Sequence, residues 1–391
     1  MTSVTIQRWI SDQQCAIVQQ FLKPVTEQNR SWLIYAIDDA MHYDDIPLFN
    51  RGRQAFASDK IQNNIKFMLN AADLVVVTTD HIKEYYNKKY GVPIENIVAA
   101  PNLLPKWWFG DRFDPEKKIE DYKRFKARPR IGVVSSLSHY NVDGIRVSKN
   151  GKACRLNKNQ QTGVERWLDQ DNNEVKFEDT EVITDDLDEI INLIRSTVKD
   201  FQWVFFGYAP PKLDDLLKDR KIEFHPGVPI LNYPSMIENL HLQAIVAPIK
   251  DMEFNKCKSH IKYLECCASG IPLFASNMLP YSNVMRRDFL FDTEDELKEK
   301  LLKLKFASVG VYRSIIEENW KWFNSPKKDG DFQIKNGWLE DNLGLWIDMF
   351  KLRPKAPTCS MNLFWQEKMK NDAERAQNMI FQGENGVEIL K

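Results

Sequence analysis

The chain has 391 residues, of which 43% are hydrophobic and 28% are charged, with 16 glycines and 18 prolines. This is the composition of an ordinary globular protein, and it excludes collagenous, low-complexity and largely disordered chains. The 54 basic and 55 acidic residues give a formal charge of -1, so the overall charge does not indicate a nucleic-acid-binding protein.

Short runs rich in Val, Ile and Phe alternate with helical stretches, which is typical of parallel sheets with crossover helices. The predicted fold class is therefore α/β. In the first part of the chain, the predicted strands are Thr5–Trp9, Trp32–Ile37, Leu74–Thr78 and Ile97–Ala99. The predicted helices are Asp12–Glu27, Ser58–Ala71 and Thr79–Lys89.

A charged segment at residues 112–128 has the composition of an exposed connector between domains, and we expect a hinge there. A second series of strands follows it. These strands are predicted at Arg130–Val134, Trp203–Gly207, Ile222–His225, Ala244–Pro248 and Leu273–Ser276. They indicate a second sheet of the same type.

The pattern predicts two Rossmann-like, doubly wound domains, over residues 1–120 and 121–325, with an insertion at 141–183. A helical tail is predicted over residues 326–391, and we expect it to pack back across both domains. Doubly wound sheets bind ligands at the carboxyl ends of their strands. Two such domains facing each other therefore predict a shared cleft, lined by the residues that follow the strands.

The segment at residues 254–276 is the strongest candidate for part of that cleft. With Asn255 as N-cap and Gly270 just beyond the last turn, it predicts a helix of about three to four turns. One face of this helix is apolar. A separate stripe carries three charged side chains: Lys258, Lys262 and Glu265.

This charged stripe suits a nucleotide sugar. Glu265 can accept hydrogen bonds from both ribose hydroxyls, each charge-assisted bond being worth about 1.5–3 kcal/mol. Lys258 lies in the first turn, where its ammonium and the free backbone N–H groups can hold a diphosphate. The alternative is a solvated helix face with a Lys262–Glu265 pair, worth about 0.2–0.5 kcal/mol.

The segment resembles the donor domain of the retaining family 4 glycosyltransferases, which have the GT-B fold. Their donor helix carries two glutamates spaced E-x7-E, followed by a small residue, Gly, Pro and a strand. The match covers the second glutamate and the residues after it, namely Glu265, Ala268, Gly270 and Pro272. The first glutamate position is Cys257, so the carboxylate that contacts the donor sugar in the family is missing. Three residues are left to replace it: Lys258, Ser259 and Asn255.

The resemblance implies further donor contacts. A Ser-rich loop after the first strand of the second sheet offers hydroxyl and N–H groups to phosphate oxygens, although an ordinary strand-to-loop turn is the alternative. The ends of the next two strands resemble the segments that enclose the nucleotide base. The predicted donor-binding residues are Ser136, Ser138, His139, Gly207, His225, Gly227, Val228, Asn255, Ser259, Lys262 and Glu265. The predicted catalytic residues are Lys258 and, in the first domain, Asp39.

The acceptor side is predicted in the first domain, where two acids follow a strand, an arrangement that suits sugar hydroxyls or a cation. Capping of a turn is the alternative. This stretch resembles the acidic stretch of many family 4 enzymes. His81, in the same domain, is interpreted as a helix-start residue rather than a base. The predicted acceptor-binding residues are Asp38, His42, Asn50, Arg51, Arg53, Asn102, Arg146, Lys149 and Lys152.

The insertion at 141–183 has alternating residues and Asn-Gly turn signals, which predict a β-hairpin. From Gly144 to Arg166 it has six basic residues and one acid, a charge of +5. Residues 122–130 hold a second basic cluster, and we expect both clusters near the mouth of the cleft, beside Trp107 and Trp108. Basic residues with exposed aromatics suit a polyanionic acceptor. A solvated hairpin without a partner is the alternative.

The sequence thus predicts a GT-B glycosyltransferase that moves a sugar from a nucleoside diphosphate donor, a UDP-sugar, to an acceptor hydroxyl with retention. The compact first domain and basic hairpin resemble bacteriophage enzymes that glycosylate hydroxymethylcytosine, so a hydroxymethylated base in DNA is the predicted acceptor. The alternatives are a transferase that builds a surface glycan or polymer, and an inactive GT-B module that binds nucleic acid. Neither a cofactor nor a metal is required, because Lys258 and helix amino termini can neutralise the departing diphosphate.

The location follows from what the chain lacks. No apolar run approaches the roughly 18 residues of a membrane span, and the amino terminus has no secretory-signal pattern, so a cytoplasmic protein without a membrane span is predicted, in the host cytoplasm for a phage enzyme. The cysteines show no C-x-x-C pair and are interpreted as reduced structural thiols, which argues against a zinc site or a disulfide framework. They are Cys15, Cys154, Cys257, Cys266, Cys267 and Cys359.

Overall fold

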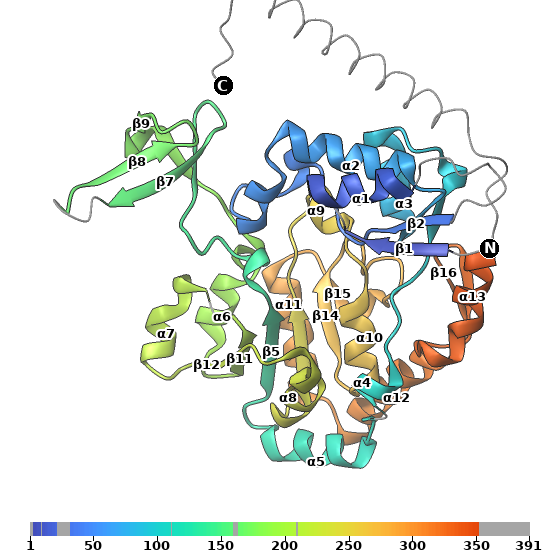
Figure 1. Ribbon diagram of the computed structural model, residues 1–391. Helices are drawn as coiled ribbons and strands as arrows, with labels where there is room; N and C mark the ends of the chain where they lie inside the picture. The colour runs from blue at the N-terminus through green and yellow to red at the C-terminus, as the bar shows by residue number, and fades with distance from the viewer. Residues whose placement is uncertain are drawn as a thin grey trace, which may run out of the picture.

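The computed structural model describes residues 3–8, 10–21, 32–110, 112–158, 163–208 and 210–351 (Figure 1). These residues form two lobes, each built on a parallel sheet. The strand order is β1-β2-β3-β4 in the first lobe and β12-β11-β5-β13-β14-β15 in the second. The predicted α/β class with two parallel sheets is confirmed.

The first lobe follows the sequence pattern closely, because β2, β3 and β4 are apolar runs and α2 and α3 have capping residues. Ser58 and Thr79 accept hydrogen bonds from the first turns of α2 and α3. The predicted end of the first helix, Glu27, lies outside the described residues. The strands are β1 (Ser3–Gln7), β2 (Trp32–Ala36), β3 (Leu74–Val77) and β4 (Ile97–Ala99). The helices are α1 (Asp12–Phe21), α2 (Asp59–Ala71) and α3 (Asp80–Tyr90).

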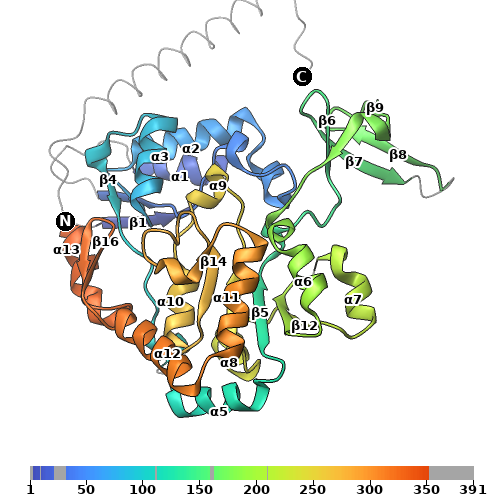
Figure 2. The ribbon, with the colours of Figure 1, turned by 180° about the vertical axis from the view of Figure 1, so that it is seen from behind.

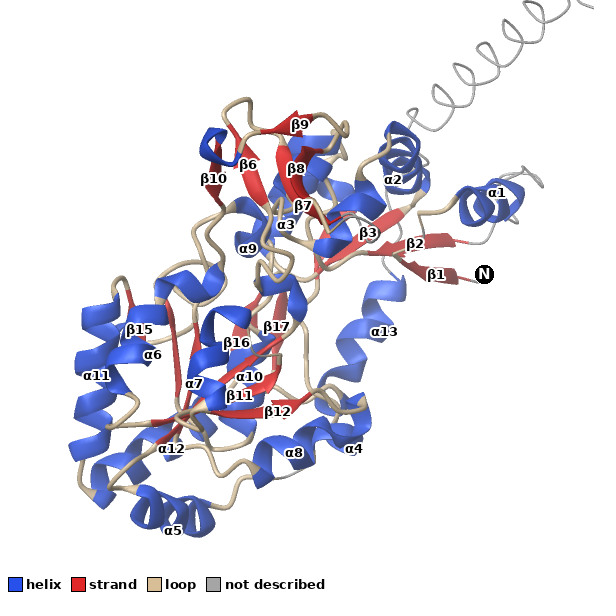
Figure 3. Cartoon of the chain, turned by 90° about the vertical axis from the view of Figure 1, so that its left-hand side faces the viewer, coloured by secondary structure: helices blue, strands red, loops and turns tan. Residues whose placement is uncertain are grey.

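In the second lobe, helices lie on both sides of the six-stranded sheet (Figure 3). Its strands are β5 (Arg130–Ser135), β11 (Gln202–Gly207), β12 (Glu223–Pro226), β13 (Ala244–Ala247), β14 (Leu273–Ser276) and β15 (Leu290–Phe291). Its helices are α4 (Lys106–Phe109), α5 (Pro115–Phe125), α6 (Ile191–Thr197), α7 (Asp214–Lys218), α8 (Tyr233–Asn239), α9 (Glu253–Lys256), α10 (Ile261–Ala268), α11 (Glu294–Phe306) and α12 (Val309–Phe323).

The predicted exposed connector at 112–128 is wrong, because most of it forms α5, a helix packed on the second lobe. Asp114 caps its first turn, and Ile119 and Tyr122 are buried. The ring of Tyr122 stacks on Tyr312 of α12, with ring centroids 4.1 Å apart. Most charges of this segment lie on the outer face of an amphipathic helix, although Lys118 and Asp121 are buried, and composition alone does not distinguish such a helix from a linker.

The insertion is larger than the predicted hairpin. It forms a five-stranded antiparallel sheet in the order β10-β6-β7-β8-β9, which stands to one side of both lobes (Figures 1 and 2). Its strands are β6 (Arg146–Ser148), β7 (Ala153–Lys158), β8 (Glu165–Asp169), β9 (Glu174–Val175) and β10 (Thr180–Val182). The predicted antiparallel pairing is confirmed, and β10 closes the sheet by pairing with β6.

The segment after α12 returns to the first lobe, as predicted. It forms the antiparallel pair β16 (Lys327–Asp329) and β17 (Phe332–Ile334), followed by α13 (Leu343–Lys351), so it is not wholly helical. Phe332 and Trp346 pack on the first sheet, while Trp338 packs on Phe323 of α12. The rest of the predicted tail, residues 352–391, lies outside the described residues.

The helix α9 belongs to the chain of the second lobe but lies between the two sheets (Figures 1 and 2). Phe254 and Cys257 are members of the buried core of the first lobe. The two lobes are therefore joined by apolar packing at α9. None of the helices that the structure describes is long and apolar enough to cross a bilayer.

Candidate functional site

The predicted helix from Asn255 to Gly270 is interrupted. It consists of α9 and α10, with a non-helical link at residues 257–260. Asn255 is not an N-cap, because its side chain is buried and donates to Asp186 Oδ1 at 2.9 Å and to the carbonyl of Lys250 at 3.0 Å. Gly270 does end the second helix, with a φ of +64°, as predicted.

Glu265 belongs to a compact polar cluster. The hydroxyl of Tyr233 donates to Glu265 Oε2 at 2.7 Å, and Lys262 Nζ donates to the same oxygen at 3.0 Å and to the Tyr233 hydroxyl at 3.0 Å. The Lys262–Glu265 pair of the alternative interpretation is present, but these side chains are only 22% and 13% exposed, so they do not form a solvated helix face. Burial is the largest single influence on the pKa of Lys262 and lowers it, but Glu265, Tyr233 and Cys266 together raise it by more, so the net pKa stands well above its usual value and the ammonium is charged at neutral pH.

Aromatic rings fix this cluster in place. The ring of Tyr233 stacks on Phe206 at 5.7 Å and on Trp108 at 6.1 Å. Both hydrogen bonds reach Oε2 of Glu265, and among the described residues none donates to Oε1. Oε1 is therefore the oxygen that a ligand hydroxyl would reach, and the role of Glu265 in donor binding stays a prediction.

The start of α10 offers groups for an anion. No side chain of a described residue caps its amino end, so its first backbone N–H groups are free of side-chain partners. The ammonium of Lys258 lies 4.3 Å from the ring centroid of Phe254 and has no acidic partner among the described residues. Ser259 Oγ accepts from Asn102 Nδ2 at 2.8 Å, which joins a predicted donor residue to a predicted acceptor residue of the first lobe.

A buried carboxylate that the sequence analysis missed organises the donor-side loops. Asp186 is 2% exposed and accepts from the backbone N–H of Lys250 at 2.8 Å and from Asn255. His139 Nδ1 lies 2.7 Å from the other carboxylate oxygen. The only sequence signal was the acid pair at 185–186, which lies just outside the insertion. In the neighbouring loop, the hydroxyls of Ser136 and Ser138 are hydrogen-bonded to each other at 2.7 Å.

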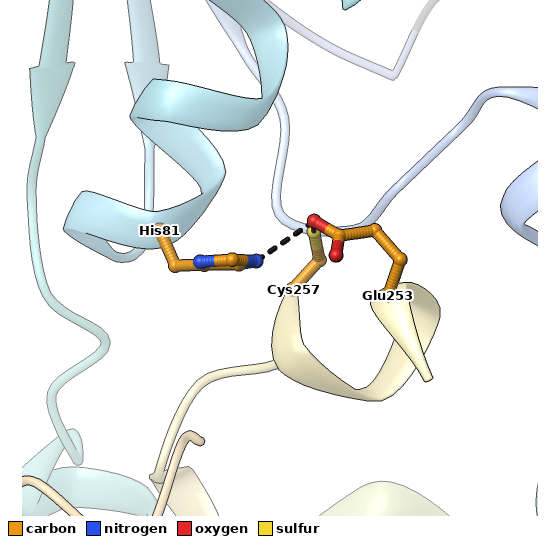
Figure 4. A group of neighbouring side chains, drawn as sticks. All are labelled: His81, Glu253 and Cys257. Carbon is orange, nitrogen blue, oxygen red and sulfur yellow. Dashed lines mark hydrogen bonds and ion pairs between the residues drawn. The ribbon is translucent and has the colours of Figure 1, made fainter. Parts of the chain in front are cut away.

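A second group missed by the sequence analysis spans the two lobes (Figure 4). His81 Nε2, from the first turn of α3, lies 2.8 Å from Oε1 of Glu253 on α9. Cys257 Sγ, which follows α9, is 4.0 Å from the same oxygen. Burial raises the pKa of the Cys257 thiol, so it carries its proton at neutral pH. His81 is a helix-start residue, as interpreted from the sequence, and it also contacts the second lobe.

The two acids that follow β2 are both paired with one arginine of the same lobe. Asp38 and Asp39 both form ion pairs with Arg8, which follows β1 and has a φ of +53°. Their predicted catalytic and acceptor roles stay predictions. His42 Nδ1 accepts from the backbone N–H of Asp44 at 3.3 Å.

The polar residues of the segment 50–53 are also engaged. The amide of Asn50 reaches the carbonyl of Ser138 at 3.5 Å, so the two predicted site halves meet here as well. Arg51 forms a bidentate ion pair with Asp143 at the root of the insertion, at 2.5 and 2.8 Å. The guanidinium of Arg53 lies 3.8 Å from the ring centroid of Tyr43.

The basic residues of the insertion are mostly paired within it. Lys149 contacts Asp179 at 2.5 Å and Lys152 contacts Asp171 at 2.5 Å. Arg146 donates to the hydroxyl and carbonyl of Thr180. Residues 141–183 as a whole hold seven basic and eight acidic residues, a charge of -1, so the +5 of the first half is balanced by the second half.

The second basic cluster does not lie at the mouth of a cleft, and that prediction is wrong. Arg130 opens β5 and forms a bidentate pair with Glu223, while Arg128 donates to two carbonyls, those of Val198 and Lys221. These groups lie at the amino end of β5, whereas ligands bind at the carboxyl ends of such sheets. The guanidinium groups of Arg128 and Arg130 therefore form hydrogen bonds and ion pairs between elements of the second lobe.

The predicted base-binding residues follow β11 and β12. Gly207 lies beside Ser135 in the parallel register, and Gly227 lies against Gly207, so the ends of these strands approach closely. His225, on the edge strand β12, lies 3.4 Å from Glu223. Val228 is partly buried against the second core.

Replacing Gly207 with Ala is expected to destabilise the second lobe by about 1–3 kcal/mol, since Gly207 has a φ of +99° and an added Cβ would sit 2.5 Å from the carbonyl oxygen of Ser135. Thermal unfolding measures the loss. Gly151→Ala is the matched control, because Gly151 also has a positive φ, +75°, but an added Cβ meets nothing within 4 Å. If both variants lost the same stability, the close approach of Gly207 to the Ser135 carbonyl would not contribute to the effect.

No protein-family model matches the chain, and no curated protein matches it by sequence. Solved structures match its fold. Sucrose-phosphate synthase from Thermosynechococcus elongatus is 12% identical, with 89% of this chain and 73% of that chain covered and a TM-score of 0.53. A glycosyltransferase from Rickettsia africae is 12% identical (89% and 76% covered, TM-score 0.46), and Anabaena HepE in complex with UDP and glucose is 10% identical (83% and 72% covered, TM-score 0.48). The fold is the predicted GT-B arrangement of two Rossmann-like lobes.

Proposed function

We propose that the chain is a glycosyltransferase that uses a nucleoside diphosphate sugar, a UDP-sugar, as donor. The observation that carries the proposal is Glu265, held by Tyr233 and Lys262 with one carboxylate oxygen left for a ligand. The GT-B fold and the solved complex of HepE with UDP and glucose are consistent with it. Binding of UDP and of UDP-glucose to the purified chain, measured by calorimetry, tests the proposal directly.

The donor is proposed to lie along the second lobe from Glu265 toward the link between α9 and α10. Glu265 accepts from the ribose hydroxyls, and Lys258 with the first N–H groups of α10 holds the diphosphate. As the glycosidic bond breaks, negative charge grows on the diphosphate, and fixed donors stabilise it more than they stabilise the bound substrate. Transfer with retention is part of this proposal, and NMR of the product's anomeric proton tests it.

Glu253 is proposed to supply the carboxylate missing at position 257. It stands four residues before Cys257 on α9, and its oxygen lies 4.0 Å from the Cys257 sulfur, so it reaches the place of the family's first glutamate from one turn earlier. Its side chain is 38% exposed and therefore accessible to a sugar hydroxyl. None of the three replacements expected from the sequence is a carboxylate.

We expect Glu253→Gln to lower kcat/KM for the sugar donor by about 10- to 100-fold, because one charge-assisted bond to the sugar is lost. The affinity for UDP should stay unchanged, since UDP has no sugar at this end. Steady-state kinetics and calorimetry with UDP measure the two effects. Asp251→Asn is the control: Asp251 is two residues away, 75% exposed and paired with Lys256, and it should change neither. Equal losses for UDP and UDP-sugar would contradict the assignment.

For the acceptor, a hydroxymethylated base in DNA stays the prediction from sequence, and a glycan hydroxyl is the other candidate. The balanced charge of the insertion removes the strongest electrostatic argument for DNA. Mass spectrometry of hydroxymethylated DNA and of oligosaccharides, after incubation with the chain and a panel of nucleotide sugars, distinguishes them by a mass increment on one or the other.

A further inference from the structure

We propose that His81, Glu253 and Cys257 form a zinc site that joins the two lobes. One ligand atom from each residue lies within 4.8 Å of the others, and Figure 4 shows the three side chains converging from α3 and from α9 with the residue after it. In a tetrahedral zinc site, with bonds of about 2.0–2.3 Å, neighbouring ligand atoms are about 3.3–3.8 Å apart. Shifts of under about 1 Å bring these three atoms to that spacing.

The ligand types select the metal. A thiolate, an imidazole and a carboxylate together suit Zn²⁺, whereas Mg²⁺ and Ca²⁺ prefer oxygen ligands alone. On binding, Cys257 releases its thiol proton to solvent and bonds through Sγ, and Glu253 bonds as a carboxylate. Nε2 of His81 carries the proton of its hydrogen bond to Glu253, so it bonds through its lone pair only after that proton has left to solvent, with the remaining ring proton held on Nδ1. The side chains of His81 and Glu253 are 26% and 38% exposed, so water reaches a fourth position, as in zinc sites with three protein ligands.

Charged groups of both signs lie around Cys257. Burial is the largest influence on the pKa of Cys257 and raises it, the carboxylates of Glu253, Asp45 and Asp39 raise it further, and the Lys258 ammonium lowers it. Asp39 is paired with Arg8 and Asp45 with Lys89, so the Glu253 carboxylate, itself a ligand, is the one left to attract a cation. The ligands are also held firmly, because Cys257 is fully buried in the first core and Thr79 caps the helix that carries His81. Binding of a dication therefore requires side-chain shifts of under about 1 Å and no refolding of either helix.

Cysteine spacing predicted no zinc site because the ligands are far apart in the chain: His81 and Glu253 are separated by 172 positions. Only the packing of α9 into the first lobe unites them. Zinc bound here fastens the lobes to each other and occupies Glu253. If the proposed function holds, zinc therefore also competes with the donor sugar. This consequence rests on the proposed function, whereas zinc binding itself does not.

The test is zinc affinity of the full chain, freed of any affinity tag, measured without nucleotide by competition with a chromophoric chelator. We expect one zinc ion per chain and a loss of affinity of more than about 100-fold in His81→Ala and in Cys257→Ser. With Co²⁺ as probe, a thiolate-to-metal charge-transfer band should appear in the wild type and vanish in Cys257→Ser. His241→Ala is the control, because His241 also faces a carboxylate, Asp121 at 3.0 Å, but no thiol.

The outcomes are separable. A wild-type chain that binds no zinc, or a His81→Ala variant that binds it as the wild type does, overturns the proposal. Circular dichroism shows whether Cys257→Ser is folded, and if it is not, His81→Gln decides, since His81 is partly exposed and its replacement leaves the core intact. A chain that binds zinc through these residues but no UDP-sugar would overturn the proposed function and leave the zinc site standing.

Discussion

Glu265→Gln is expected to lower kcat/KM for the nucleotide-sugar donor by at least about 100-fold. The substitution keeps the shape of the side chain but removes the charge that strengthens two hydrogen bonds to the ribose hydroxyls, each worth about 1.5–3 kcal/mol. It also leaves the ammonium of Lys262 without its carboxylate, so the free energy of unfolding should fall by about 1–3 kcal/mol. Steady-state kinetics with the sugar donor measure the first effect, calorimetry shows whether UDP affinity falls with it, and thermal unfolding measures the loss of stability.

Glu238→Gln is the matched control for this experiment. Glu238, on α8, accepts from two cations, Arg112 at 3.0 Å and Lys117, so its replacement also breaks ion pairs in the second lobe. Within the described ranges it forms no hydrogen bond or ion pair with Glu265, Tyr233 or Lys262, so donor affinity should stay unchanged. A folded Glu265→Gln variant that binds UDP as tightly as the wild type would refute the assignment of the nucleotide site. A variant that loses UDP but retains nucleic-acid binding would favour the alternative of a binding module.

The strands could be predicted because the pattern that indicates a strand, a run of apolar residues, lies within the strand itself. Leu74–Val77 is a continuous apolar run, all four of its residues are buried, and the prediction differed from the structure by one residue. The second-lobe strands follow the same rule, since a parallel sheet covered on both faces needs apolar side chains on both faces of each strand. Capping residues such as Ser58 likewise act on their own helix.

The broken donor helix was not predictable from its own residues. The stretch at 254–268 contains no Pro or Gly, so local propensity favours one continuous helix. The structure ends α9 at Lys256 because Phe254 and Cys257 are buried in the core of the first lobe, which turns α9 away from the line of α10. A contact with the other lobe overrides propensity here. For the same reason, the pairing of Glu253 with His81 could not be found in advance.

The predicted positive charge of the insertion was misleading for a different reason. A count over its first half indicated a polyanion-binding ribbon, but partners of those cations follow in the second half. Asp179, the partner of Lys149, is 30 positions away and comes near only when β10 pairs with β6. Charge counts therefore depend on strand register, which the sequence of one chain does not display.

Asp186→Ala is expected to lower the free energy of unfolding by about 3–5 kcal/mol and to abolish transfer. The buried carboxylate accepts from the N–H of Lys250 and the amide of Asn255. Its removal takes the side-chain acceptor from the Lys250 N–H and leaves the Asn255 amide with the carbonyl of Lys250 alone. These donors belong to the loop that leads into α9 and to α9 itself. The loss should therefore displace Glu253 as well as soften the second lobe.

Urea unfolding and kinetics with the sugar donor measure the two consequences of Asp186→Ala. Asp219→Ala is the control, since Asp219 is 58% exposed and its ion pair among the described residues is with Lys221. The control should leave both quantities unchanged, because exposed pairs contribute little. Asp186→Asn retains an oxygen that accepts from Asn255 or Lys250. Its stability and activity should therefore lie between those of Asp186→Ala and those of the control variant. An Asp186→Ala variant as stable as the control would mean that α9 is held by the apolar packing of Phe254 and Cys257 alone, so that the site tolerates loss of its buried carboxylate.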